Sequence, residues 1–163
     1  MTPRSILPLL ALVLAATAAA EAPKTAPVAY PDGYRQWALV RSMVIYSDKN
    51  PLFAQFGGFH HVYANAQAMR ALTKGGTFGD GSILVLDLRD AKDDGGAYTE
   101  GDRKLVAVMQ KDRARWKATG GWGFEAFKGE SHSERTVTDA AEQCFGCHQQ
   151  QKDNDFAFSG YRP

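Results

Sequence analysis

The sequence has only two cysteines among its 163 residues, Cys144 and Cys147. A chain with so few cysteines is not a small fold held together by a framework of disulfides. After its first twenty residues it also lacks any apolar run near the ~20 residues that a membrane-spanning helix needs. We therefore expect the chain to fold around an apolar core, for which a hydrophobic content of 44% is ordinary.

An excess of charge of one sign is absent too. The chain has 19 basic and 18 acidic residues, well mixed, and a net charge of +1. Because no basic stripe is present, nucleic acid is not an expected partner. The length is typical of a single domain.

The N-terminus has the three parts of a secretory signal peptide. These are Arg4, an apolar run over residues 6–16, and small residues at 18–20. We predict a signal peptide over residues 1–20, and a periplasmic mature protein that is not held in a membrane after cleavage. An uncleaved membrane anchor is the alternative, although the apolar run is short for that role.

The next residues predict an unstructured start followed by a helix. Residues 21–33 hold three of the seven prolines and read as a linker or an extended N-terminal arm, which leaves residues 34–163 as the folded domain. Within residues 34–46, apolar side chains recur at helical spacing, so this segment is predicted to be an amphipathic helix. The residues with that spacing are Trp37, Val40, Met43 and Val44.

The middle of the chain changes to the period of a strand. In residues 83–90 every second residue is apolar on one face, which carries Leu84, Leu86 and Leu88. Short strands without crossover helices indicate an antiparallel sheet, so the fold class is predicted to be α+β, a sheet packed with helices. The other predicted elements are strands at 59–64, 103–112 and 120–129, a polar loop at 91–102, a helix capped by Asn65 that runs through Leu72 to a stop at Gly75-Gly76, and a helix at 136–143 capped by Thr138.

Both cysteines belong to one motif near the C-terminus, Cys144-Phe-Gly-Cys147-His148. A zinc site would need a fourth ligand from a distant histidine. A thioredoxin-like couple would place the motif after a first strand, and a disulfide across two residues would leave His148 unexplained. Covalent haem uses all three residues, since two thiols bind the porphyrin and the histidine binds iron. We therefore predict one haem c held by Cys144, Cys147 and His148.

The order of the residues disfavours two common kinds of c-type cytochrome. An electron-transfer cytochrome of class I has its motif near the start and an axial methionine after it, whereas the last methionine here is Met109. A four-helix cytochrome c′ has a late motif but is helical throughout. The 16 glycines and the predicted strands disfavour that fold.

The chain resembles the cytochrome P-460 family, which includes the cytochromes c′-beta. The resemblance lies in "GGWGFEAF", "CFGCH" and the C-terminal "KDNDFAFSGYRP", with "YRQWALV" and "GTFGDGSILVLDLRD" fitting the same pattern. It covers about residues 33–163. It implies an antiparallel sheet with helices, one haem c, a proximal histidine, an open distal site on the iron and a homodimer.

The resemblance also implies a subclass. Family members that oxidise hydroxylamine have a lysine cross-linked to the porphyrin, and the matching position here is Leu86, which cannot form that bond. In the c′-beta pattern aromatic residues cap the open iron position, and Phe56 and Phe59 lie in the matching segment. His60 matches a basic position of the pocket and could donate a proton. Core packing is the alternative for each phenylalanine, and a surface or sheet-edge site the alternative for His60.

Three functions follow from these expectations. The first is binding of nitric oxide or a related small nitrogen-oxide ligand at a five-coordinate haem. The second is enzymatic oxidation of hydroxylamine or nitric oxide, and the third is plain electron transfer with a redox partner protein. A further carboxylate, Glu125, lies on the predicted strand at 120–129. It reads either as a proton acceptor near the haem or as part of a solvated strand face.

Overall fold

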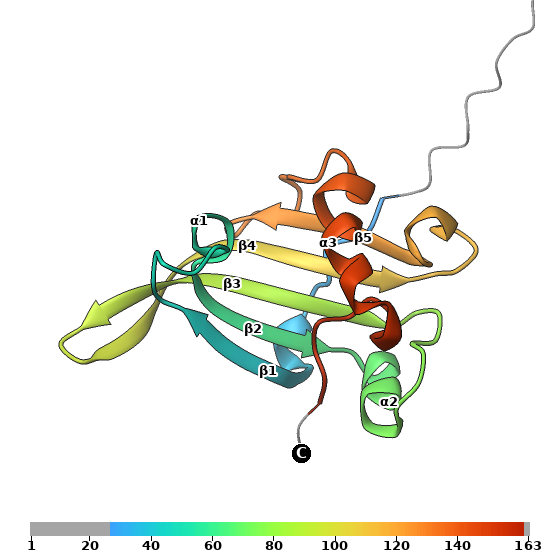
Figure 1. The fold of residues 1–163 in the computed structure, drawn as a ribbon, viewed down its shortest axis with the longest axis horizontal. Helices are drawn as coiled ribbons and strands as arrows, with labels where there is room; N and C mark the ends of the chain where they lie inside the picture. Colours follow the sequence, from blue (N-terminus) through green and yellow to red (C-terminus); the bar gives the residue numbers. More distant parts are fainter. Residues whose placement is uncertain (1–26, 162–163) are drawn as a thin grey trace, which may run out of the picture.

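The computed structural model describes residues 27–161 and has a five-stranded antiparallel sheet at its centre (Figure 1). The strands lie in chain order, each hydrogen-bonded to the next. With the helices that accompany it, this sheet confirms the predicted α+β class. The strands are β1 (Ala38–Ile45), β2 (Gly58–Ala64), β3 (Ile83–Asp94), β4 (Ala97–Lys111) and β5 (Trp122–Lys128).

The helices are short and lie between or after the strands. Tyr34–Gln36 and Lys117–Thr119 are single 3₁₀ turns, and Gln149–Asn154 is a longer 3₁₀ segment near the C-terminus. The α-helices are α1 (Phe53–Phe56), α2 (Ala66–Lys74) and α3 (Gly146–His148). No helix within residues 27–161 is long and apolar enough to cross a membrane. The predicted signal peptide and residues 21–26 of the predicted arm lie outside the described residues.

The helix predicted over residues 34–46 is wrong, because Ala38–Ile45 is the edge strand β1. Its pairing with β2 runs from Ala38 opposite Ala64 to Ile45 opposite Gly58. A β-bulge at Val40, between Leu39 and Arg41, shifts the alternation by one residue. That shift produced the apparent helical spacing of the apolar side chains.

The polar loop predicted over residues 91–102 is also wrong, because β3 and β4 continue through it as a hairpin. The strands end at Asp94 and restart at Ala97, so only Gly95 and Gly96 form the turn. Both glycines have positive φ, 58° and 104°, which a two-residue hairpin turn requires. The side chains here are exposed on both faces, so the sequence has no apolar alternation to mark the strands. In Figure 1 this hairpin extends beyond the rest of the sheet.

The predicted helix after Asn65 is confirmed as α2. The Asn65 side chain accepts a hydrogen bond from the Ala68 amide at 2.9 Å, as an N-cap does. The helix ends at Lys74, two residues beyond the predicted end, and Gly75 follows with a φ of 75°. The strands predicted at 59–64, 83–90, 103–112 and 120–129 are confirmed as β2 to β5.

Each face of the sheet has its own apolar cluster. On the face that we call the helical face, Leu84, Met109 and Phe124 pack with α2 and with Phe145 beside α3. On the opposite face, Val85, Val106 and Phe127 pack with Val28 of the N-terminal segment and with Tyr34. The alternation predicted for β3 therefore holds, with Leu84 and Val85 in different clusters.

Candidate cofactor site

The Cys-x-x-Cys-His motif lies in a continuous helical stretch on the helical face. Ala141–Phe145 is one π-helical turn, and α3 and the 3₁₀ segment follow it directly. The stretch starts where Asp139 Oδ1 accepts hydrogen bonds from the amides of Ala141 and Glu142, at 2.9 and 3.1 Å. The predicted helix over 136–143 therefore begins later than expected, and Asp139 rather than Thr138 caps it. The Thr138 hydroxyl instead donates to Gln143 Oε1 at 3.3 Å, so it does not cap the helix.

The two thiols are both unpaired and differ in exposure. Cys144 is half-buried and Cys147 is exposed. Burial, aided by the negative charge of Glu125, raises the pKa of Cys144 to about 11, so this thiol stays protonated at neutral pH. Among residues 27–161 no group of three or more histidine, cysteine or acidic side chains is arranged to hold a metal ion. The zinc alternative therefore gains no fourth ligand from this part of the chain.

His148 presents one ring nitrogen for coordination. Its Nδ1 lies 2.7 Å from the carbonyl oxygen of Phe156. Because a carbonyl can only accept, Nδ1 carries the hydrogen and Nε2 keeps its lone pair. Burial lowers the pKa of His148, which favours the neutral ring, although the bond to Phe156 works in the opposite direction. A neutral imidazole whose second nitrogen is bound to a carbonyl is the usual form of a metal-ligating histidine.

Aromatic rings enclose the His148 imidazole. Phe124 of β5 and Phe158 of the C-terminal tail each have their ring centroid 5.0 Å from it. Phe124 also contacts Phe145, which is part of the buried cluster under the helical stretch. The ring is therefore held by packing as well as by its hydrogen bond.

Apolar side chains on the helical face would suit a flat apolar group. Leu86 pairs with Val62 of β2 and Ala107 of β4, and both neighbours share its face of the sheet. All three, and Leu105 beside them, are only half-buried, unlike Leu84 and Leu88. This row of small and branched side chains, with two free thiols and a neutral imidazole on the same face, fits a haem.

His60 and Phe56 lie together at the other end of that face. His60 pairs with Leu88, so it shares the face of Leu86. Its Nε2 donates to the Phe56 carbonyl at 2.6 Å, and the two rings are 6.5 Å apart. Burial lowers the pKa of His60, with smaller contributions in the same direction from His61 and Lys104, so the ring is neutral near pH 7.

Phe59 is the candidate that the structure does not bring to this face. It pairs with Arg89, and its ring stacks on His61 at 5.9 Å on the opposite face of the sheet. Adjacent residues of a strand point to opposite sides, so Phe59 and His60 cannot both face Leu86. The same register places His60 and His61 on opposite faces of the sheet.

Several residues near the site were not expected from the sequence. Lys104 is the extra residue of a β-bulge in β4, and its amine donates to the Gly57 carbonyl at 2.9 Å, close to His60. The Phe156 carbonyl, which binds His148, was not expected either, and neither was the buried Lys111, which binds Asp155 in the turn. A backbone acceptor has no sequence signature, and a lone lysine in a strand reads as surface.

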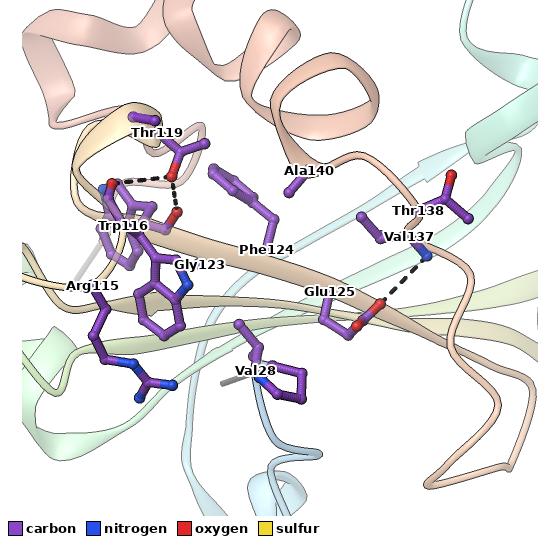
Figure 2. Close-up of a pocket in the computed structure, with 13 residues that line it drawn as sticks. Val28, Arg115, Trp116, Thr119, Gly123, Phe124, Glu125, Val137, Thr138 and Ala140 are labelled. Carbon is purple, nitrogen blue, oxygen red and sulfur yellow. Dashed lines mark hydrogen bonds between the residues drawn. The ribbon is translucent and has the colours of Figure 1, made fainter. Parts of the chain in front are cut away.

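Glu125 is neither solvated nor free, contrary to the expectation of a solvated strand face. It is 7% exposed, and its Oε2 lies 2.6 Å from Arg135. It lines a pocket of about 440 Å³ beside β5, together with Phe124, Trp116 and Val28 (Figure 2). Figure 2 also shows its carboxylate bound to the Val137 amide, so the group serves to tie the segment before the cysteines to the sheet.

Comparison with known proteins gives a match over most of the chain. A family model described as Cytochrome P-460 matches residues 31–159, which include the whole sheet, both cysteines and His148. A search of curated proteins found no match.

Proposed function

The chain belongs to the cytochrome P-460 family, and we propose that it is a haem c protein that binds nitric oxide or a related small nitrogen oxide. Membership of the family implies a haem cofactor and a cytochrome-type function. The finer assignment, to ligand binding rather than to oxidation of hydroxylamine or to electron transfer, is our proposal.

The observation that carries the proposal is the state of His148. A neutral ring with Nδ1 tied to the Phe156 carbonyl has a single lone pair to give, on Nε2. Cys144 and Cys147 lie four residues and one residue before it in the same helical stretch, so their thiols would hold one haem beside that nitrogen. Bound there, the haem would supply an iron that His148 would coordinate and that would bind a small ligand.

The side chains across the helical face support binding of a ligand that needs no hydrogen-bond donor. Phe56 and Leu86 are apolar. The Nε2 hydrogen of His60 is already used by the Phe56 carbonyl, which leaves only the acceptor Nδ1 on that neutral ring. Bound O₂ depends on a donor for stability more than nitric oxide does, so this lining favours nitric oxide.

The same side chains bear on the enzymatic alternative. Leu86 has no amine with which to form a porphyrin cross-link, and its neighbours Val62 and Ala107 have none either. We propose export to the periplasm from the signal-like N-terminus, and a homodimer from the family resemblance.

The first experiment is the absorption spectrum of the purified protein after anaerobic reduction. An ordinary high-spin c-type spectrum that changes on addition of nitric oxide is the expected result. A strongly red-shifted ferrous Soret band would indicate a cross-linked haem and would make hydroxylamine oxidation the leading function. A six-coordinate low-spin spectrum that does not respond to nitric oxide would favour electron transfer.

Mass spectrometry of haem peptides gives an independent check on attachment. The expected peptide contains Cys144, Cys147 and His148 and carries one haem through two thioether bonds. Replacing each cysteine by alanine should remove one thioether bond and leave a haem attached through the other. A haem that is lost on denaturation of the unchanged protein would contradict covalent attachment.

A further inference from the structure

We infer that the buried ion pair between Lys111 and Asp155 positions the Phe156 carbonyl and thereby sets how strongly His148 donates to iron, an inference that rests on the proposed function. Lys111 belongs to β4 and is only 2% exposed. Its Nζ lies 2.7 Å from Asp155 Oδ1 and 3.0 Å from the Gly120 carbonyl. The ammonium also lies 4.8 Å from the centre of the Trp122 ring. Its charge is therefore directed at one partner, Asp155.

Asp155 is held from two further directions. Its Oδ2 accepts from the Phe78 amide at 2.8 Å, and its backbone carbonyl accepts from Trp122 Nε1 at 2.8 Å. Both partners are fully buried and pack against each other, with ring centroids 5.2 Å apart. The position of Asp155 is therefore fixed relative to the sheet.

The backbone at this point needs such anchors. Asp155 and Phe156 have φ of 47° and 66°, and they are the non-glycine residues with positive φ among those described. A left-handed conformation is unfavourable for any residue with a Cβ, and aspartate tolerates it more readily than phenylalanine does. Such conformations persist where surrounding contacts over-determine them. The two consecutive residues are thus kept in an unfavourable turn by the contacts of Asp155.

The turn points the Phe156 carbonyl at the imidazole of His148. The Phe156 amide donates to Gln151 at 2.7 Å, and the next polar atom of the same residue, its carbonyl oxygen, accepts from His148 Nδ1. The Phe156 ring packs directly against Gly120, where an added Cβ would lie 2.5 Å from the ring. Gly120 is also the residue whose carbonyl binds Lys111. One buried lysine thus fixes both the turn and the surface on which Phe156 rests.

The consequence for the ligand follows from the hydrogen bond. A carbonyl that accepts from Nδ1 orients the imidazole and makes Nε2 a stronger donor to a metal. Loss of the ion pair would release the turn, lengthen this bond and weaken the donation. An anchor that serves only stability would leave the iron–histidine bond unchanged as long as the protein stays folded.

The test compares Lys111→Met, Asp155→Asn and the double variant in the holoprotein. Resonance Raman spectroscopy of the ferrous form gives the frequency of the iron–histidine stretch, and a redox titration gives the midpoint potential. Asp80→Asn is the matched control, because Asp80 binds the exposed Arg113 at 3.2 Å and its loss also removes one carboxylate from an ion pair. Thermal unfolding is followed for every variant.

We expect both single variants to retain covalent haem, to lower the stretching frequency and to raise the midpoint potential, while Asp80→Asn changes neither. The double variant leaves no buried charge unpaired, so it should regain part of the stability lost by the single variants. Its frequency should remain low, because the anchor is still missing. If the ion pair positions the carbonyl, the double variant should therefore recover stability without recovering the iron–histidine frequency.

Two results would overturn the inference. One is a frequency that is unchanged in both single variants that carry haem. The other is a frequency that recovers together with stability in the double variant. Failure of the proposed function looks different, since the unchanged protein would then show a red-shifted ferrous Soret band or a low-spin spectrum that does not respond to nitric oxide.

Discussion

Phe59 and His60 are neighbours in β2, yet their side chains lie on opposite faces of the sheet. His60 pairs with Leu88 on the helical face, and Phe59 pairs with Arg89 and stacks on His61. Phe56, in the helix before the strand, has its ring 6.5 Å from the His60 imidazole and accepts a hydrogen bond from His60 at its carbonyl. The structure therefore separates two phenylalanines that the sequence offered as equal candidates.

Replacing Phe56 by alanine should change the kinetics of nitric oxide or CO binding, whereas replacing Phe59 should not. An aromatic contact is worth about 1 kcal/mol, which corresponds to a change in rate of about fivefold. Both variants lose a half-buried ring, so Phe59→Ala controls for general loosening of this segment. Stopped-flow or flash photolysis of the ferrous protein measures the rates. Equal effects in the two variants would exclude Phe56 as a specific cap.

Replacing His148 by glycine should leave the haem attached and remove its proximal ligand. The thioether bonds to Cys144 and Cys147 do not depend on the imidazole, so the haem should remain in a denaturing gel. The iron–histidine band should disappear, and added imidazole should restore a ligand in the space left by the ring. His132→Gly is the control, because His132 is exposed and pairs with Asp32 at 3.0 Å. An unchanged spectrum in His148→Gly would contradict the assignment.

The motif could be read from the sequence because its residues are contiguous. Cys144, Cys147 and His148 occupy five positions of one helical stretch, and their order carries the chemistry. The strand alternation of β3 was readable for a similar reason, since it depends on neighbours in the chain. The helix cap at Asn65 is also local.

Features that depend on distant residues could not be read in this way. The bulge at Val40 is defined only by pairing with β2, and without that pairing the spacing favours a helix. Lys111 and Asp155 are 44 residues apart and meet because the C-terminal turn lies over the end of β4. The alternation of the strand placed Leu86 on one face with Leu84 and Leu88. Which of Phe56 and Phe59 lies on that face depends on the register of β2.

Replacing Asp87 by asparagine should strongly destabilise the protein. Asp87 is fully buried and accepts hydrogen bonds from Tyr34, Arg35 and Arg103 at 2.9 Å each. Removing one partner of a buried charge network costs about 3–5 kcal/mol, because the remaining charges lose their compensation. Chemical denaturation measures the loss. Glu134→Gln is the control, since Glu134 forms an exposed pair with Lys128 and should cost less than about 1 kcal/mol.

The same carboxylate should contribute to acid sensitivity. Burial alone would raise the pKa of Asp87, but the hydrogen bonds from Arg103 and Tyr34 and the charges of Arg103 and Arg89 outweigh it, so the net shift is downward. The unfolded chain therefore binds a proton at a higher pH than the folded chain. This contribution is complete above the unfolded pKa of about 3.9 and is lost as the pH falls below it. In Asp87→Asn the stability curve should be flatter below about pH 4, and an equally steep curve would contradict this account.

His60 should make stability depend on pH in a higher range. Its folded pKa is lowered, first by burial and then by the charges of His61 and Lys104, while the bond to Phe56 opposes the shift. The unfolded chain takes up a proton near pH 6.5 and the folded chain resists it, so stability falls as the pH drops below about 6.5. The slope is at most about 1.4 kcal/mol per pH unit for one proton.

A variant that removes this titration tests the assignment. His60→Gln should be less stable at pH 7.5 and should lose less stability between pH 7.5 and 5.5 than the unchanged protein. His132→Gln, at an exposed site, should keep the full slope. A slope unaffected by His60→Gln would mean that His60 is protonated as readily in the folded protein as in the unfolded chain, and that burial does not hold its ring neutral.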